Sequence, residues 1–285
     1  MKIRDVEIGY DQPTWFCAEI SCNHLGSKAL ALELIQTAAD IGCDSVKFQL
    51  YGPEDFDPPD EAYKDIYRAA YTPAEWLPEL RCVAHGLGLA FIVSPFWHPR
   101  YVDVLEALPV DAYKVGFSEF YNVPMLERIR ETGRPVIAST GMATWEEIYA
   151  FYHILDEAGH YPLAMLHCVS GYPTPADSMN LGKLIDMIEE HCEEGIGTPI
   201  GLSEHTTTTH FSLAAAVAGA CIIERHLIKE RNGVSPDNDF SLEPHEFGQL
   251  IREVREVEAA FSQCEYGILP CEQEFAWRKE RSKGR

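Results

Sequence analysis

Short apolar runs alternate with helix-length segments along most of the chain. The apolar runs, each six to eight residues long, are predicted strands at residues 15–21, 45–50, 89–95, 112–117, 135–140, 163–170, 199–205 and 221–228. The segments that follow them are predicted helices at residues 28–41, 73–85, 98–107, 123–131, 144–158, 180–191, 211–219 and 244–261. Near-continuously apolar strands alternating with helices indicate a parallel sheet covered by helices. Eight such units also close a barrel, so we predict an α/β protein with a TIM (β/α)8 barrel.

An open, doubly wound sheet is the alternative fold for this order of elements. Its dinucleotide-binding members carry a Gly-x-Gly-x-x-Gly turn after the first strand, and this chain has none there. The barrel is therefore the preferred interpretation.

Two helix starts are marked by capping signals. Thr72 followed by Pro73 is typical of an N-cap and a first helical position. Thr144 with Glu147 three residues later is typical of a capping box. We expect helices to begin at both places.

Length and composition agree with one enzyme-sized domain. The chain has 285 residues, close to the roughly 250 that a TIM barrel needs. We assign residues 1–264 to the barrel and residues 265–285 to a basic C-terminal extension, in which five of the last eight residues are Lys or Arg.

The net charge and the cysteine content indicate which partners and which cellular compartment to expect. The formal net charge of −22 argues against nucleic-acid and anionic-membrane partners, which would be repelled. Nine scattered cysteines without a Cys-x-x-Cys pair favour reduced thiols and a cytoplasmic location. No run of about 18 apolar residues marks a membrane span.

Polar side chains gather where the predicted strands end, which is where a TIM barrel places its active site. A charged residue inside an apolar strand is costly to bury without a partner. The polar residues at or just after the predicted strand ends are Glu19, Lys47, Gln49, Ser94, Lys114, Glu119, Ser139, Ser170, Ser203, His205, Glu224 and His226.

The last two strands each finish in a histidine. Alternate strand residues share a face, so Ser203 lies with His205 and Glu224 lies with His226. Parallel strands joined by one helix bring both imidazoles to the same end of the sheet. This predicts a two-histidine metal platform. A pair of structural histidines at the barrel mouth is the alternative.

Two lysines stand inside apolar strands. Lys47 and Lys114 are suited to anchor a phosphate or carboxylate in a protein whose overall charge repels anions. Ser139 and the residues up to Thr144 add hydroxyls and backbone N–H groups ahead of a helix N-terminus, which also suits an anion.

An ordered set of motifs closely resembles the sialic acid synthase family, which includes N-acetylneuraminate synthases and their legionaminic and pseudaminic relatives. The resemblance runs from about residue 15 to residue 260. Its motifs are Ala18-Glu19-Ile20-Ser21-x-Asn23-His24-x-Gly26, Val46-Lys47-Phe48-Gln49, Tyr113-Lys114-Val115-Gly116, Ser139-Thr140-Gly141-Met142, His167-Cys168-x-x-x-Tyr172-Pro173-Thr174-Pro175, Gly201-Leu202-Ser203-Glu204-His205 and Glu224-Arg225-His226.

The resemblance implies a TIM barrel that condenses phosphoenolpyruvate with an aldose or amino sugar and uses a divalent metal, Mn²⁺ or Mg²⁺. It implies His205 and His226 as metal ligands, with Glu224 a weaker candidate. Positions that hold phosphoenolpyruvate correspond to Lys47, Ser94, Lys114, Ser139, Ser170 and Ser203. Catalytic positions correspond to Glu19, Gln49 and Glu119, and acceptor-facing positions to Glu119, Tyr172 and Asp237. A homo-oligomer is expected.

Several departures from the family pattern bear on the acceptor. Phe117 stands where the family usually has a phosphate-contacting serine, Ser170 where it has asparagine, and Glu204 where it has aspartate. The chain ends before the small antifreeze-like domain of typical members, so we expect a barrel-only member that recognises its acceptor differently. Two alternatives stay open: the same chemistry on a non-sialic acceptor, and a catalytically silent barrel that binds phosphoenolpyruvate or a sugar.

Overall fold

A computed structural model describes residues 1–52, 54, 55, 61–156, 161–193, 197–261 and 266–283. Its centre is a closed barrel of eight parallel strands in the order β10-β3-β4-β5-β6-β7-β8-β9. The strands are β3 (Trp15–Glu19), β4 (Ser45–Leu50), β5 (Ala90–Pro95), β6 (Ala112–Val115), β7 (Val136–Ser139), β8 (Leu163–Cys168), β9 (Ile200–Glu204) and β10 (Ile222–His226). The predicted TIM barrel is confirmed, and each strand lies within the run predicted for it.

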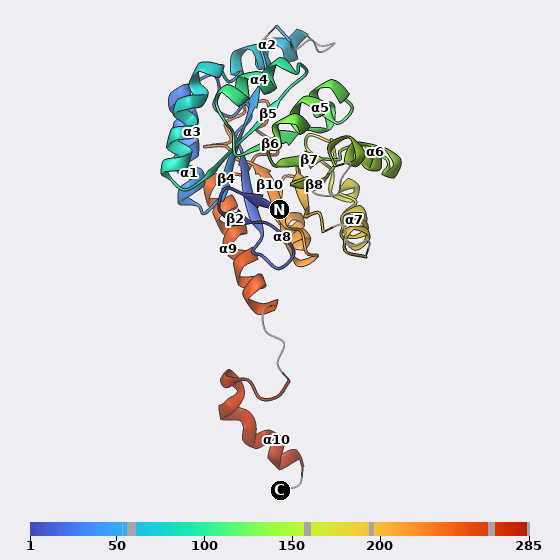
Figure 1. Cartoon of the computed structure of the whole chain (residues 1–285). Coiled ribbons are helices and arrows are strands. Elements are labelled where there is room, and N and C mark those ends of the chain that lie inside the picture. Colours follow the sequence, from blue (N-terminus) through green and yellow to red (C-terminus); the bar gives the residue numbers. More distant parts are fainter. Residues whose placement is uncertain (53, 56–60, 157–160, 194–196, 262–265, 284–285) are drawn as a thin grey trace.

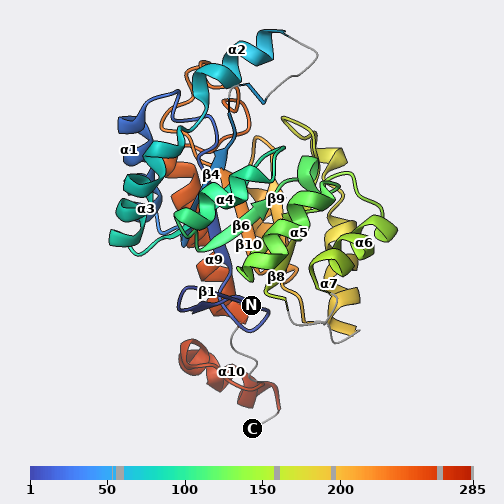
Figure 2. The same cartoon turned by 45° about the horizontal axis from the view of Figure 1, so that its top comes forward.

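Helices surround the barrel on all sides in two views (Figures 1 and 2). They are α1 (Lys28–Asp40), α3 (Leu77–Gly86), α4 (Arg100–Ala107), α5 (Val123–Thr132), α6 (Trp145–Leu155), α7 (Leu181–Glu193), α8 (His210–Val217) and α9 (Pro244–Phe261). Their buried apolar faces pack on the outward-facing strand residues and form the larger part of the core. The capping box of α6 is present, with Thr144 and Glu147 bonding reciprocally.

The predicted cap at Thr72 is wrong. The chain there enters a 3₁₀ turn, η1 (Ala74–Trp76), before α3, and no side chain caps either start. The Thr72 hydroxyl instead lies 3.0 Å from Nε2 of His24, so the side chain serves a tertiary contact.

Among the described residues, two helical regions were not predicted, apart from the short 3₁₀ turns η2 (Phe117–Glu119) and η3 (Ala176–Ser178). One is α2 (Glu61–Ala70), inserted between β4 and η1. The other comprises η4 (Pro270–Phe275) and α10 (Ala276–Ser282), which lie apart from the barrel in both views (Figures 1 and 2). Both regions lie outside the regular alternation of strands and helices, so the hydrophobic pattern did not predict them.

The barrel interior changes from apolar to polar along the strands. At the amino ends Trp15, Ile92 and Ile222 fill it, and Ile3 and Ile8 join their cluster from the ribbon of β1 (Lys2–Ile3) and β2 (Val6–Glu7). Because alternate residues face inward, the next inward positions fall at the carboxyl ends of the strands. The fold therefore closes one end of the barrel with apolar side chains and leaves the polar set at the other.

Candidate active site

A cavity of about 500 Å³ lies at the carboxyl ends of the strands. This volume is within the range of about 300–1,000 Å³ that small-molecule sites occupy. Inward-facing strand residues make its floor, and the predicted residues among its lining are Glu19, Lys47, Gln49, Ser94, Lys114, Ser139, Ser203, His205, Glu224 and His226, joined by Tyr172 and Asp237. Barrel closure thus brings together residues that are far apart in the chain.

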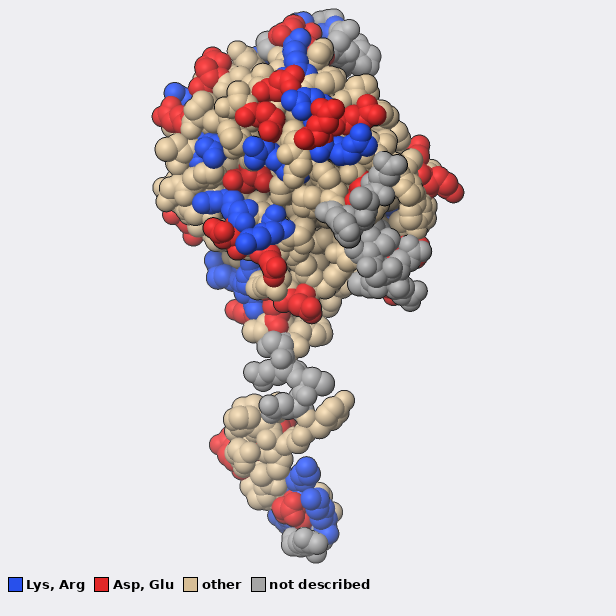
Figure 3. All heavy atoms as spheres, in the orientation of Figure 1, with Lys and Arg blue, Asp and Glu red and all other residues tan. Residues whose placement is uncertain are grey.

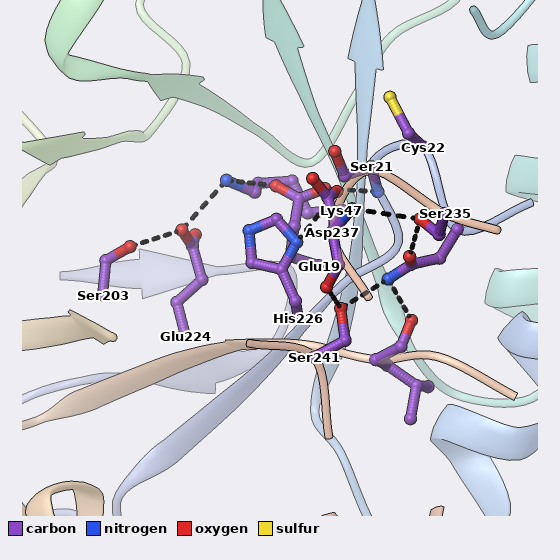
Figure 4. Close-up of polar contacts among 12 residues, drawn as sticks. Glu19, Ser21, Cys22, Lys47, Ser203, Glu224, His226, Ser235, Asp237 and Ser241 are labelled. Atoms are coloured by element: carbon purple, nitrogen blue, oxygen red, sulfur yellow. Dashed lines mark hydrogen bonds and ion pairs between the residues drawn. The ribbon is translucent and has the colours of Figure 1, made fainter. Parts of the chain in front are cut away.

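A buried charge cluster occupies the cavity floor (Figure 4). The ammonium group of Lys47 lies 2.5 Å from Oε2 of Glu19 and 2.9 Å from Oε1 of Glu224. The same Glu224 oxygen accepts a hydrogen bond from Ser203 (2.9 Å) and lies 3.5 Å from Lys114 Nζ. All four charged side chains are at most 7% exposed, so their pairing is what makes burial tolerable.

The two glutamates of this cluster have opposite pKa shifts. Burial raises the pKa of Glu19, against the opposing charge of Lys47. Burial would also raise the pKa of Glu224, but Lys114 and Lys47 together lower it to about 2. A pair of carboxyls with diverging pKa values is typical of an acid–base group beside a permanent anion. The protonated form is thus more favoured for Glu19 than for Glu224.

The pKa values of Lys47 and Lys114 also shift in opposite directions. Burial lowers the pKa of Lys114, whereas Glu19 and Glu224 outweigh burial and raise the pKa of Lys47. Lys114 Nζ donates to the Ser139 hydroxyl at 2.6 Å. Both lysines therefore project from the barrel floor into the cavity, where an anion could contact them.

The two strand-end histidines meet at the cavity wall. The ring centroids of His205 and His226 are 5.4 Å apart, and Nδ1 of His226 lies 3.2 Å from Oδ2 of Asp237. Burial, then the neighbouring His226, lowers the pKa of His205 well below its usual range, which keeps this imidazole neutral. Neutral imidazole is the form that binds metal ions. The predicted convergence of the two imidazoles is confirmed.

Glu224 does not join the imidazoles. Its carboxylate is paired with the lysines and Ser203. Within the described part of the chain, no three His, Cys, Asp or Glu side chains gather closely enough to hold a metal ion by themselves. β10 places Glu224 one inward position deeper than His226, so its carboxylate contacts the lysines here, and its role as a weaker metal ligand stays a prediction.

Two predicted residues do not line the cavity among those the structure describes. Glu119 is buried outside the cavity lining, where Asn122 Nδ2 donates to its Oε2 at 2.8 Å. Ser170 is also outside the lining. Their predicted contacts with substrate stay predictions: Phe117, Ser118 and Tyr172 of the same two segments line the cavity, whereas these two side chains do not.

Phe117 lines the cavity and packs against Gly141. Gly141 has φ +49°, and a Cβ at this position would collide with Cβ of Phe117. The aromatic ring therefore borders the segment before α6, and glycine is required where the two segments meet.

The sequence prediction missed an aromatic wall made of Tyr51, Tyr67, Phe96 and Trp97. All four line the cavity, from the end of β4, from α2 and from the segment after β5. The barrel rule could have indicated Phe96 and Trp97, because they directly follow a strand. Tyr67 carried no signal, because α2 was not predicted.

The outer surface carries charges of both signs. On the face in Figure 3, Lys and Arg side chains are interspersed with Asp and Glu, without an extended basic patch. No helix in the described ranges has both the length and the apolar character that crossing a membrane requires.

Comparison with known proteins identifies the family. The NeuB family matches residues 34–266. The N,N'-diacetyllegionaminic acid synthase of Campylobacter jejuni is 31% identical over 263 residues, covering 87% of this chain and 77% of the relative. The N-acetylneuraminate-9-phosphate synthase of Homo sapiens is 30% identical over 278 residues, covering 93% and 76%.

A solved structure extends the similarity to three dimensions. The N-acetylneuraminic acid synthetase of Leptospira borgpetersenii, solved with citrate, superimposes with a TM-score of 0.87 at 27% identity and covers 98% of this chain and 96% of that one. The family resemblance seen in the motifs is confirmed. With its barrel, its polar floor and these relatives, the chain belongs to the NeuB family of sialic acid synthase-type enzymes.

Proposed function

We propose that the protein condenses phosphoenolpyruvate with the aldehyde form of an amino sugar to give a sialic-acid-like 3-deoxy-2-ulosonic acid and phosphate. The observation that carries the proposal is the floor of the cavity, where two buried ammonium groups lie beside a glutamate of raised pKa and below two converging imidazoles. The relatives are named as synthases of such acids.

Phosphoenolpyruvate carries a phosphate and a carboxylate, and the floor offers groups for both. Lys47 and Lys114 would supply charge, and Ser94, Ser139 and Ser203 would donate hydrogen bonds from the same floor. Buried, preorganised cations bind such anions strongly and hold them in one orientation. The role of these residues is thus positioning and electrostatic stabilisation.

The imidazoles fit a divalent cation. Nδ1 of His226 and Oδ2 of Asp237 are buried 3.2 Å apart, and neither atom makes a hydrogen bond of good geometry, so a cation could take the place of their mutual contact. Imidazole nitrogen beside a carboxylate oxygen suits a divalent cation, and Mn²⁺ or Mg²⁺ is the candidate that the family resemblance implies. With few protein ligands, coordination positions remain for substrate or water. Such a cation, when bound, would polarise the acceptor's aldehyde oxygen as a Lewis acid.

The proposed reaction forms one C–C bond and breaks one C–O bond. Carbon 3 of phosphoenolpyruvate forms a C–C bond with the aldehyde carbon, and water adds to carbon 2. The bond between carbon 2 and the phosphate oxygen then breaks, leaving a keto acid. One proton of the water ends on the new hydroxyl and the other on the released phosphate. Glu19, next to Lys47 on the floor, is positioned to take and return the proton of the attacking water.

The test is a phosphate-release assay on the purified chain with Mn²⁺, phosphoenolpyruvate and a panel of aldoses, with the product identified by mass. Release that requires both the metal and a sugar supports the proposal. Tight phosphoenolpyruvate binding without release with any aldose would favour the silent barrel instead.

A matched pair of variants links the activity to the floor. Lys114→Met removes one ammonium group and leaves Glu224 paired with Lys47, so the fold should persist while phosphoenolpyruvate affinity falls at least tenfold. Lys28→Met removes an exposed lysine that pairs with Glu79 and should leave the affinity unchanged. Equal affinities in the two variants would exclude the floor as the binding site.

A further inference from the structure

The chain that follows β10 returns to the cavity before α9 begins. It leaves the barrel at Leu227 and comes back at Leu242, and these two residues form an isolated β-bridge. We call residues 228–241 between them the return segment. Two of its side chains, Asp237 and Phe240, line the cavity. Their positions therefore depend on what holds the return segment against the barrel.

Both of these side chains contact the imidazoles. Oδ2 of Asp237 lies 3.2 Å from Nδ1 of His226. The ring centroid of Phe240 lies 4.8 Å from that of His226 and 5.6 Å from that of His205. The return segment thus limits the directions in which the two imidazoles can present their nitrogens.

A buried amide from another part of the chain holds the return segment. Asn23 follows β3, is 1% exposed and does not line the cavity. Its Nδ2 donates to the Leu227 carbonyl at 2.9 Å and to the Ser241 hydroxyl at 2.9 Å. Its Oδ1 accepts a hydrogen bond from the Ser235 hydroxyl at 2.5 Å. Both N–H donors and the oxygen of this amide are therefore in use.

The two serines connect Asn23 to Asp237. The Ser235 hydroxyl accepts from the backbone N–H of Asp237 at 3.2 Å, and the Ser241 hydroxyl donates to the Asp237 carbonyl at 2.6 Å (Figure 4). Each hydroxyl thus bonds Asn23 on one side and the backbone of Asp237 on the other. A buried network in which every member is satisfied is rigid and admits few alternative geometries.

This network fixes Asp237 from both sides of its own peptide backbone. The carboxylate that faces His226 belongs to a residue that is only 6% exposed, so its direction is set by the backbone that carries it. Asn23 precedes Ser235 by 212 residues, and the contact joins the end of β3 to the return segment. The side chain of Asn23 can therefore act on the imidazoles without touching a substrate.

Resting on the cation that the proposed function places at the imidazoles, we propose that Asn23 is a positioning residue for it. Through Ser235 and Ser241, Asn23 holds Asp237 against His226 in the geometry that a bound cation requires. Residues that orient metal ligands without touching the metal typically change metal affinity by about 10- to 100-fold when they are removed.

The Mn²⁺ affinity of the folded chain tests the proposal. Asn23→Ala removes both connections to Asp237, and Ser235→Ala removes one of them. The Kd of Mn²⁺, measured from the paramagnetic resonance signal of the free ion, should rise at least roughly tenfold in Asn23→Ala and less in Ser235→Ala. The Kd of phosphoenolpyruvate, measured without metal, should stay within about twofold of wild type, because the floor lysines lie outside the network.

A matched variant separates positioning from general stability. Tyr161→Phe removes a hydroxyl that donates to the carbonyls of Ile129 and Arg134, and Tyr161 does not line the cavity. It should destabilise the fold and leave the Kd of Mn²⁺ unchanged. A network with only a structural role would behave in the same way, so an unchanged Kd in folded Asn23→Ala overturns the proposal. Ser235→Ala takes the place of Asn23→Ala if the latter does not fold.

The metal-free chain gives a second readout. Side-chain ¹⁵N resonances of His226, assigned with His226→Ala, report its contact with the carboxylate, and Asp237→Asn defines their positions without that charge. In Asn23→Ala they should move toward the Asp237→Asn positions, whereas Tyr161→Phe should match wild type. Wild-type resonances in Asn23→Ala overturn the proposal. A wild-type chain that binds no Mn²⁺ contradicts the proposed cation instead, and the resonances then still decide whether Asn23 holds Asp237 against His226.

Discussion

Glu204 Oε2 lies 2.9 Å from Nη1 of Arg225, and both side chains are completely buried. Each residue directly precedes one of the two cavity imidazoles, His205 and His226. Because neighbouring strand residues face opposite sides, the ion pair lies outside the barrel while the imidazoles face in. Arg225 also donates to the carbonyls of Thr206 and Thr208. The ion pair therefore anchors the segment after β9 to β10.

Removing Arg225 should be strongly destabilising. Arg225→Ala leaves Glu204 as an uncompensated buried charge, for which we expect a loss of about 3–5 kcal/mol in the free energy of unfolding. Urea denaturation measures this loss of unfolding free energy. Arg128→Ala, which breaks an exposed pair with Asp103, should cost less than about 1 kcal/mol. Similar losses in the two variants would show that the buried ion pair contributes no more to the free energy of unfolding than an exposed pair.

Metal binding should depend on the converging imidazoles. His226→Ala removes one of the two, and we expect the variant to lose stoichiometric Mn²⁺ after gel filtration, measured by elemental analysis. His153→Ala, an exposed histidine on α6, should retain the wild-type content. A His226→Ala variant that still holds one Mn²⁺ per chain would remove this residue from the ligand set.

The two floor glutamates should respond differently to amidation. Glu19→Gln removes the group of raised pKa, and kcat should fall by roughly 10²- to 10⁴-fold. Glu224→Gln removes the permanent anion from the lysines, and unfolding free energy should fall by roughly 3 kcal/mol. Steady-state kinetics and urea titrations of both variants separate the roles. Wild-type kcat in Glu19→Gln would refute the proton-transfer assignment.

The contact between Phe117 and Gly141 predicts an energetic coupling. Gly141→Ala combines a left-handed backbone with a collision, so we expect a loss of about 3 kcal/mol of stability. In a Phe117→Gly background, which removes the colliding Cβ as well as the ring, only the backbone cost of about 1 kcal/mol should remain. Gly133→Ala has φ +66° and open space around it, and provides the value for the backbone cost alone. Additive losses in the double variant would contradict the contact.

His24 should make the fold sensitive to acid. Its side chain is buried against Thr72, and burial lowers its pKa to about 4. The unfolded state, with an ordinary pKa of about 6.5, binds more protons between these values, so stability falls as pH drops through this window. The contribution of His24 is about 2 kcal/mol between pH 7 and pH 5.

Urea titrations at the two pH values check this sign. His24→Leu should reduce the difference between pH 7 and pH 5 by about 2 kcal/mol. His153→Gln should leave it unchanged. A His24→Leu variant with the full wild-type difference would mean that other groups cause the acid sensitivity.

Local patterns in the sequence were sufficient for the barrel and for the composition of its floor. Strand and helix periodicity depends on near neighbours, and parallel barrel strands bring their carboxyl ends to one rim. Lys47, Lys114 and the two histidines could therefore be assigned to one cavity from their positions at strand ends alone.

Only the tertiary structure decided how these residues pair. Lys47 meets Glu224, 177 residues away, because β10 closes the barrel against β3. Tyr67 joins the aromatic wall from α2, and Phe96 and Trp97 join it from the segment after β5. Such contacts join residues distant in sequence, and their energies depend on burial and on neighbouring charges, which no local pattern contains.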